Sequence, residues 1–347
     1  MHEYAFDTEL IRLAILLGVV VSMLFYERFG VTTGGAIVPG YLALFVTRPT
    51  QIAATYFIAI LAYWIVQKYL RPQWMLWGRR LFESEILVSM TLQGIWIGLL
   101  FSLIAFVPQL SLLIGIGFVL PGIIAHDMGR QGVMTTIWAS VACTLIVFGI
   151  VVLIGAVRDV FVLPISQSGT EYRSLIDTYA YPVNWLLVAI IISVLTSIAL
   201  YHGGFLKGNL IPNSLRTGGF VTAGYLALFI NKPMDILFVL FCATLTYLFV
   251  TQFLMKKTIL FGRSKMAVMI ITGMTITWLF EIIIDVSGSQ YVPWFGFNAI
   301  TPTIVALIAN DAQRQGPLRT LMGIGASTLI VGALMSLLYY GYTIIFL

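Results

Sequence analysis

Residues 34–45 read GGAIVPGYLALF, and residues 218–229 read GGFVTAGYLALF. The two stretches are related by an offset of 184 residues, since Gly34 matches Gly218. The same offset aligns further matches: Pro49 with Pro233, Tyr63 with Tyr247, Gly78-Arg79 with Gly262-Arg263, and Asp127-x-x-Arg130-Gln131-Gly132 with Asp311-x-x-Arg314-Gln315-Gly316. A register kept over about a hundred residues indicates a tandem duplication.

The composition of the chain indicates a membrane protein. Hydrophobic residues make up 60% and charged residues 10% of the 347 residues, and apolar runs recur from end to end. This pattern predicts an all-α polytopic membrane protein. The acidic start, MHEYAFDTEL, and the lack of a small-residue cleavage site predict that the first apolar run is a retained span and not a signal peptide.

Each copy contains six apolar segments, so the sequence predicts about 12 membrane segments in two tandem six-segment repeats. Copy one has segments near 10–26, 31–47, 50–67, 86–107, 112–125 and 133–157. Copy two has segments near 183–201, 215–230, 234–254, 267–286, 295–309 and 318–346. The predicted domains are a first membrane repeat at 1–157, an extracytoplasmic linker at 158–182 and a second repeat at 183–347.

The distribution of basic residues predicts the orientation in the membrane. If the N-terminus is outside and every segment crosses, one face receives Arg12, Arg48, Arg158, Arg173 and Lys232, and the opposite face receives the other 14 of the 19 Lys and Arg residues. The positive-inside rule makes the richer face cytoplasmic. Treating 31–47 and 215–230 as re-entrant would move basic loops to the outside, so full crossing is the preferred interpretation.

The segments 31–47 and 112–125 share a Pro-Gly pair that disfavours an unbroken helix. Proline removes a backbone donor and clashes with the preceding turn, and a break inside hydrocarbon requires cover from other helices or a wet cavity. The two segments lie in the two halves of copy one, which suggests a three-plus-three inverted repeat of the kind that places transporter sites at paired broken helices. The predicted pathway or broken-helix residues are Gly34, Gly35, Pro39, Gly40, Tyr41, Pro121, Gly122, Gly218, Gly219, Gly224, Tyr225 and Pro302.

Close helix packing is the alternative use of these residues, because small side chains let membrane helices approach each other. Copy two has Ala223 and Val305 where copy one has prolines, although Pro302 stands three residues before Val305. Copy one therefore carries the more complete version of any functional break.

The basic loops and the repeated Asp-x-x-Arg-Gln turns are the predicted cytoplasmic docking surface. Its residues are Arg79, Arg80, Asp127, Arg130, Gln131, Arg263, Lys265, Asp311, Arg314 and Gln315. The same charges can simply set topology or bind anionic lipid headgroups, and the turns can be ion pairs that end a span. His126 is matched by Asn310, which favours a polar helix end.

The sequence contains no pattern for catalysis or for a metal or cofactor. The motifs H-E-x-x-H, Walker A and G-x-S-x-G are missing, and Cys143 and Cys242 lie in apolar runs. Glu281 and Asp285, four residues apart, are more typical of a solvated interface than of an acid/base pair. We therefore expect no catalytic residue, no metal, no cofactor and no nucleic-acid partner.

The motifs of copy one resemble the PgsC/CapC family of poly-γ-glutamate capsule biosynthesis. They are Val38-Pro39-Gly40-Tyr41-Leu42, then Gly78-Arg79-Arg80, then Leu120-Pro121-Gly122-Ile123-Ile124-Ala125 followed by Arg130-Gln131-Gly132. The resemblance covers one family unit over roughly residues 10–155 and, more loosely, a second at about 190–345. Most members of the family are single units, whereas this chain fuses two.

The resemblance implies a non-catalytic membrane subunit in a bacterial cytoplasmic membrane. Its implied partners are a cytoplasmic ATP-dependent amide ligase like PgsB/CapB, a membrane-anchored subunit like PgsA/CapA, the anionic polymer and membrane lipids. The alternative that the broken helices leave open is a stand-alone secondary transporter or channel for a small anionic solute.

Overall fold

The computed structural model describes residues 8–104, 107–161, 179–202, 214–289, 291–294, 297 and 300–346. The chain divides into two compact units, Met1–Ile165 and Ser166–Leu347. The first unit contains copy one and the second contains copy two, and each is described by itself. Most of the predicted linker, 158–182, lies outside the described residues.

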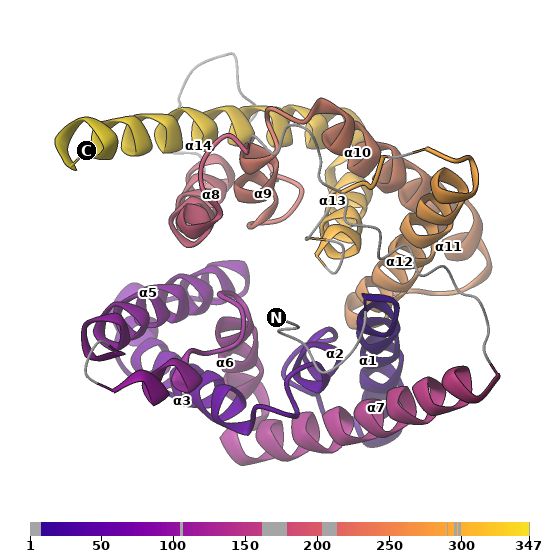
Figure 1. Cartoon of the computed structure of the whole chain (residues 1–347), viewed down its shortest axis with the longest axis horizontal. Helices are drawn as coiled ribbons and strands as arrows, with labels where there is room; N and C mark the ends of the chain where they lie inside the picture. Colours follow the sequence, from indigo (N-terminus) through magenta and orange to yellow (C-terminus); the bar gives the residue numbers. More distant parts are fainter. Residues whose placement is uncertain are drawn as a thin grey trace. The chain divides into compact units, whose positions relative to one another are not determined.

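Copy one is a bundle of long helices interleaved with short ones (Figure 1). Its elements are α1 (Thr8–Phe29), α2 (Val38–Ala43), α3 (Pro49–Ile65), a π-helix η1 (Val66–Leu70), α4 (Arg71–Trp74), α5 (Arg79–Ile104), a 3-10 helix η2 (Pro108–Leu113), α6 (Leu120–Gln131) and α7 (Val133–Phe161).

Copy two repeats the order of the α-helices and the π-helix, but it begins with an additional 3-10 helix and has none that corresponds to η2 among its described residues. It contains a 3-10 helix η3 (Val183–Trp185), α8 (Leu186–His202), α9 (Thr222–Leu228), α10 (Pro233–Leu248), a π-helix η4 (Phe249–Leu254), α11 (Met255–Lys257), α12 (Gly262–Val286), α13 (Thr301–Gln315) and α14 (Pro317–Phe346).

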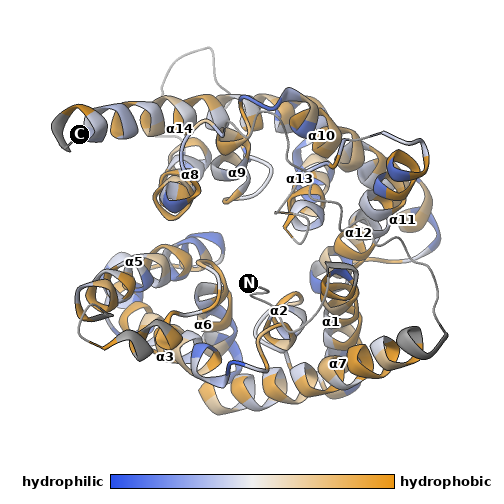
Figure 2. Cartoon of the chain, in the orientation of Figure 1, coloured by the Kyte–Doolittle hydropathy of each residue, from blue (hydrophilic) through white to orange (hydrophobic). Residues whose placement is uncertain are grey.

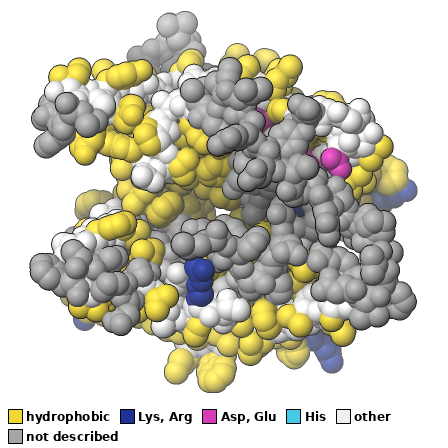
Figure 3. All heavy atoms as spheres, viewed as in Figure 1, with side chains coloured by type: hydrophobic (Ala, Val, Ile, Leu, Met, Phe, Trp, Pro, Cys, Tyr) yellow, Lys and Arg dark blue, Asp and Glu magenta, His cyan; other side chains and the backbone are white. Residues whose placement is uncertain are grey.

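Eight helices in the described part of the chain are long and apolar enough to cross a membrane, with spans of 20 to 28 residues. Their hydropathy is high around much of the helix surface (Figure 2), and large side chains such as Leu153, Phe241 and Leu337 are exposed. Hydrophobic side chains also predominate among the coloured atoms of the face in Figure 3. Such surfaces are stable in lipid, so the protein is a multi-pass membrane protein.

Eight of the about 12 predicted membrane segments are spanning helices, and the other four are not continuous helices long enough to span. The segments 31–47, 112–125, 215–230 and 295–309 contain only the short helices α2, α6, α9 and α13. The six residues of α2 and the 15 residues of α13 correspond to roughly 9 and 22 Å at 1.5 Å per residue, less than the hydrocarbon core of about 30 Å. The chain is non-helical at 31–37, 114–119 and 215–221, directly before α2, α6 and α9.

A glycine pair, and not proline, marks the break before α2 and α9. Gly34 and Gly35 have φ of 79° and 121°, and Gly218 and Gly219 have 71° and 106°. Residues with a Cβ rarely adopt this left-handed region. Copy two has Ala223 in place of Pro39, and its helix still begins directly before this position, at Thr222. Pro39 lies in the first turn of α2, where its missing N–H is not needed.

The segment that contains α2 runs antiparallel to α1, from Ser22 to its start. Thr33 hydrogen-bonds Ser22, Gly40 contacts Ala14 and Ile15, and Leu44 clusters with Ala14 and Leu10 near the start of the helix. Copy two shows the same path along α8, through Thr217 to Ser197 and Gly224 to Ala189. We call these segments the first broken crossings.

The segment before and within α6 follows α5 in the same antiparallel way. Leu113 accepts a hydrogen bond from Trp96, Gly122 contacts Ile86, and His126 contacts Glu85. In copy two, Gly273 of α12 contacts Pro302 and Val305 of α13. These are the second broken crossings. Because Pro302 starts α13 one turn earlier than Pro121 starts α6, α13 has 15 residues where α6 has 12.

The first helices of the two copies are related by a shorter offset than the rest. Ala14 and Ile15 contact Gly40 in copy one, and Ala189 and Ile190 contact Gly224 in copy two, which is an offset of 175 and not 184 for the helix residues. Residues 203–213, which are not described, therefore contain nine residues more than the corresponding connection of copy one.

The contact between Gly40 and α1 gives a test of the first broken crossing. A Cβ on Gly40 would lie 2.7 Å from the backbone of Ala14 and Ile15, whereas nothing lies within 4 Å of one on Gly98 in α5. Replacing Gly40 with Ala should destabilise the fold by about 1–3 kcal/mol through overpacking and lower the thermal unfolding midpoint of the purified chain. Gly98→Ala is the control and should leave the midpoint unchanged or raise it. Equal midpoints for the two variants would contradict this packing.

Candidate functional site

The two broken crossings of copy one meet at the positions where they change from extended chain to helix. A Cβ on Gly34 would lie 3.2 Å from Ile124 Cγ1, and one on Gly35 would lie 2.5 Å from Ile123 Cγ2. Val38 and Leu120, the first residues of α2 and α6, belong to one buried cluster. Copy two brings Gly218 against Ile308 and Gly219 against Leu307. The structure therefore places the two breaks of copy one side by side, whereas the glycine pair of copy two contacts α13 about two turns after its start.

Gln131 connects the end of the second crossing to the start of the first. Its Oε1 accepts a hydrogen bond of 2.8 Å from the backbone N–H of Thr32, and its Nε2 donates to the backbone oxygen of Thr32. The same Nε2 donates to Thr136 at 3.0 Å. The amide thus pairs with a backbone residue in the way that a neighbouring β-strand would.

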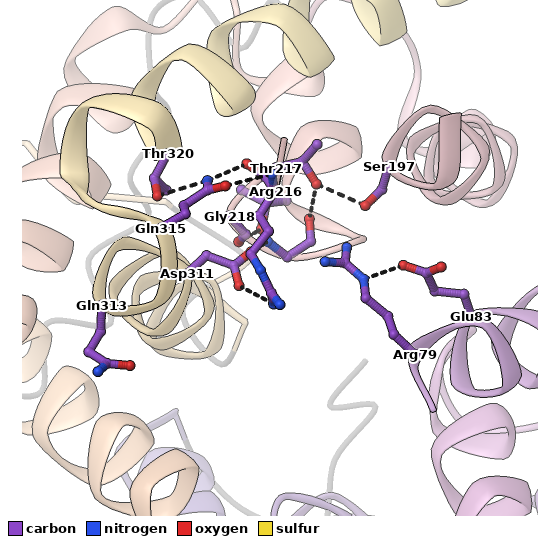
Figure 4. A network of polar contacts seen from close by, with 12 residues as sticks. Arg79, Glu83, Ser197, Arg216, Thr217, Gly218, Asp311, Gln313, Gln315 and Thr320 are labelled. Atoms are coloured by element: carbon purple, nitrogen blue, oxygen red, sulfur yellow. Dashed lines mark hydrogen bonds and ion pairs between the residues drawn. The ribbon is translucent and has the colours of Figure 1, made fainter. Parts of the chain in front are cut away.

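Gln315 repeats this arrangement in copy two (Figure 4). It accepts from the N–H of Arg216 and donates to the oxygen of Arg216, both at 2.8 Å, and it donates to Thr320 at 3.0 Å. Gln131 and Gln315, which the sequence assigned to a docking surface, therefore have a structural use inside each unit.

The aspartates of the repeated turn are buried. Asp311 accepts hydrogen bonds from the N–H of Gly219 at 3.1 Å and from Arg216 at 3.4 Å, and Asp127 occupies the matching buried position. Asp311 thus compensates one backbone donor that the glycine pair leaves outside any helix. The prediction of an exposed ion pair at this turn is incorrect for Asp311, because its carboxylate faces the broken crossing.

The basic residues of the predicted docking surface fall into two groups. Arg79 pairs with Glu83 on the first turn of α5 (Figure 4), and Lys265 donates to Gln313 at 2.8 Å and is buried. Arg80, Arg130 and Arg314 are exposed, and Arg263 is partly exposed. We call the end of each unit that carries these residues its basic end.

Polar side chains line the face of α5 that covers the second crossing of copy one. Glu85, Ser89 and Gln93 follow one another at intervals of four residues, and all three are buried. Spacing of four places them on one face of the helix. Gln93 donates to Gly115 at 3.4 Å, and Thr55 on α3 accepts from the N–H of Ile116 at 2.8 Å. Gln93 Oε1 has no hydrogen-bond donor among the described residues.

Copy two has an acidic residue and aromatic side chains at the start of its second crossing, which is the end away from Gln315. Asp235 Oδ1 accepts from the hydroxyl of Tyr291 at 2.6 Å and from the N–H of Trp294 at 3.0 Å. The Trp294 ring is buried and stacks on Phe229 at 4.1 Å between centroids. The matching residues of copy one are Gln51, Val107, Leu110 and Phe45, so this aromatic cover belongs to copy two.

Several of these residues were not predicted from the sequence. Glu85 and Asp235 are charged residues next to or within apolar runs, and this is a recognisable signal because buried charge is rare in membrane spans. Gln93 gives no signal besides its spacing from Glu85. No group of three or more His, Cys, Asp or Glu residues within the described part of the chain is placed to hold a metal ion, and both cysteines are free and buried.

These features define a class of protein: a polytopic membrane protein made of two copies, each with a pair of broken crossings that meet inside the unit. The chain belongs to the capsule biosynthesis CapC family, whose model matches residues 17–137 and again residues 213–321. Both copies are therefore CapC units.

Two curated relatives each match a stretch of this chain no longer than one copy. The PGA biosynthesis protein CapC of Bacillus subtilis (strain 168) is 34% identical over 159 residues, which cover 46% of this chain and 97% of that protein. The capsule biosynthesis protein CapC of Bacillus anthracis is 37% identical over 131 residues, which cover 37% of this chain and 85% of that protein. No solved structure matches the chain.

The two glutamines give a prediction about what holds the crossings in place. Gln131→Leu keeps the size of the side chain but leaves the N–H and oxygen of Thr32 without these partners. An unsatisfied buried polar group costs about 1–3 kcal/mol, so we expect a lower unfolding midpoint and faster proteolysis near residue 32. Gln315→Leu should have a similar effect near residue 216. Gln73→Leu, at an exposed position of α4, is the control, and a Gln131→Leu variant as stable as this control would contradict the assignment.

Proposed function

We propose that this chain is a non-catalytic subunit of a bacterial machine that makes and exports poly-γ-glutamate or a related poly-amino acid. It lies in the cytoplasmic membrane with its basic ends toward the cytoplasm. Its partners are an ATP-dependent amide ligase like CapB, a membrane-anchored subunit like CapA, the anionic polymer and membrane lipids. Both capsule biosynthesis units act within one chain.

The paired broken crossings of a CapC unit are the observation that supports this proposal most. A protein in lipid has to satisfy every backbone polar group internally, so non-helical chain at this depth requires dedicated partners. Both copies supply them at matching positions, with Gln131 on Thr32 and Gln315 on Arg216. Transporters place substrate sites at such paired breaks, which fits a role in moving polymer and not only in anchoring the ligase.

The basic end carries the positive charge that would attract a polyanion to the membrane. Exposed arginines at Arg130 and Arg314 occupy matching positions of the two copies, and positive potential raises the local concentration of an anionic chain. A ligase held at this end would release polymer next to the membrane and not into bulk solvent. The bonds of Arg79 and Lys265 tie these two side chains to their own units, and the docking candidates are chosen by exposure: Arg80, Arg130, Arg263 and Arg314.

Replacing Arg80, Arg130 and Arg314 together with Gln tests ligase docking. Exposed charge pairs contribute about 0.2–1 kcal/mol each, so recovery of the ligase with the purified chain should fall by roughly 3- to 100-fold. The loss should be greatest at low salt, because about 0.1 M salt screens charges beyond about 10 Å. The matched control is Arg48→Gln with Lys232→Gln, which removes basic residues at the opposite ends.

Membrane orientation has to be measured on the same preparations, since the same charges can set topology. A correctly oriented triple variant that retains its ligase at every salt concentration and secretes polymer normally would overturn the docking role. A misoriented variant would instead assign these charges to topology.

A stand-alone secondary transporter for a small anionic solute is the second candidate function. The buried and unsatisfied Gln93 Oε1 beside the second crossing favours it, because substrate sites leave polar groups available. The purified chain alone in vesicles distinguishes the two functions. Uptake of a labelled carboxylate solute without any ligase would support the transporter, whereas export that requires the ligase supports the synthesis subunit.

A further inference from the structure

Copy one contains a carboxylate and an imidazole in contact within the protein. Glu85 on α5 is 0% exposed, and its Oε2 lies 2.6 Å from Nδ1 of His126 on α6, whose side chain is 24% exposed. The matching residues of copy two are Met269 and Asn310. An ionisable side chain buried in a membrane span usually has a function, and the duplication shows that the fold does not require this pair.

The hydrogen bonds around Glu85 favour a carboxylate that accepts and an imidazole that carries the shared proton. Gln67 Nε2 donates to Glu85 Oε1 at 3.0 Å, and Arg71 donates to Gln67 Oε1 at 2.7 Å. An ionised carboxylate only accepts hydrogen bonds, so the contact with His126 requires a proton, which we place on Nδ1. Nε2 is then the ring atom that can accept a second proton.

The backbone of α6 is shaped to allow this contact. A Cβ on Gly129 would lie 2.4 Å from Gln67 Nε2 and 3.5 Å from Glu85 Oε1. Copy two has Gln313 at this position, and that side chain accepts a hydrogen bond from Lys265. The glycine, the acid and the imidazole therefore occur together in copy one and are replaced together in copy two.

The charged groups near the pair come from several elements around α6, whereas α3, which packs against α6, contains the titratable Tyr56 and Tyr63 but no charged residue. The η1–α4 segment provides Arg71, α5 provides Arg79, Arg80 and Glu83, and α6 itself provides Asp127 and the exposed Arg130. In α7, no charged residue occurs before Arg158. Phe82 covers the imidazole edge-on, with ring centroids 4.9 Å apart. An imidazolium at His126 would turn the buried charge of Glu85 into a neutral ion pair.

We propose that Glu85 and His126 form a proton-binding site in the second broken crossing of copy one. The Nε2 atom takes a proton from water at the basic end, which gives an imidazolium paired with the Glu85 carboxylate. Release of that proton returns a neutral ring with its hydrogen on Nδ1. Because the two residues lie on different helices, the bound proton strengthens the attraction between α6 and α5.

This inference goes beyond the proposed function and does not depend on the ligase or the polymer. It makes the second crossing of copy one responsive to pH through a glutamate–histidine pair, which copy two replaces with Met269 and Asn310. The two fused copies would then differ in how proton concentration acts on them.

Nitrogen NMR of the full chain in lipid discs tests the site, because the protein has only three histidines. With ¹⁵N-labelled histidine near pH 6.5, an ordinary value for imidazole titration, the His126→Asn variant assigns the His126 signals by their loss. We expect a His126 ring with a proton on Nδ1 and with positive charge. In Glu85→Gln the ring should lose its positive charge, because the compensating carboxylate is gone.

Two further variants distinguish loss of the Glu85–His126 contact from a general change in the structure. Gly129→Gln keeps both titratable residues but pushes Gln67 and Glu85 away from α6, so it should change the His126 signals as Glu85→Gln does. If Glu85→Gln does not fold, Gly129→Gln still tests whether the contact with Glu85 determines the charge of the His126 ring. Glu27→Gln removes an exposed carboxylate at the end of α1 and should change nothing. A neutral wild-type ring protonated on Nε2, or His126 signals that Gly129→Gln leaves unchanged, would overturn the proposal.

Discussion

The structure depends on satisfying backbone polar groups where the chain crosses the membrane without being helical. Lipid offers no hydrogen bonds, so the extended parts of the broken crossings require side chains as partners. Gln131 and Gln315 serve the first crossings, Thr55 serves the second crossing of copy one, and Asp235 serves that of copy two. Many of the buried polar residues are therefore explained by this requirement before any function is considered.

The duplication separates what the fold needs from what one copy has acquired. Features that occur in both copies, such as the positive-φ glycine pair and the glutamine bonded to the extended chain, belong to the architecture. Features found in one copy are not required by the architecture. The Glu85–His126 contact occurs in copy one, and the stacked Trp294 and Phe229 occur in copy two. Two fused units can thus share a fold while their inner surfaces diverge.

The charged residues at the basic ends have more than one use. Arg79 and Lys265 hold partners within their own units, and Arg216 contributes both its backbone and its guanidinium to the first crossing of copy two. The exposed Arg130 and Arg314 are better placed for the proposed docking role. A simple count of positive charges indicates orientation, but the contacts show which of them can take part in recognition.

The sequence by itself determined the membrane class, the duplication and the family, because composition and a repeated register are visible without coordinates. It also located the segments that contain breaks, although it placed the first break at Pro39 and not at Gly34-Gly35. It could not show that residues 31–37, 114–119 and 215–221 are non-helical chain followed by a short helix, since apolar runs of both kinds have the same hydropathy. The use of Gln131 and the contact of Glu85 with His126 were decided by tertiary structure, because they join residues 99 and 41 positions apart through the antiparallel packing of separate helices.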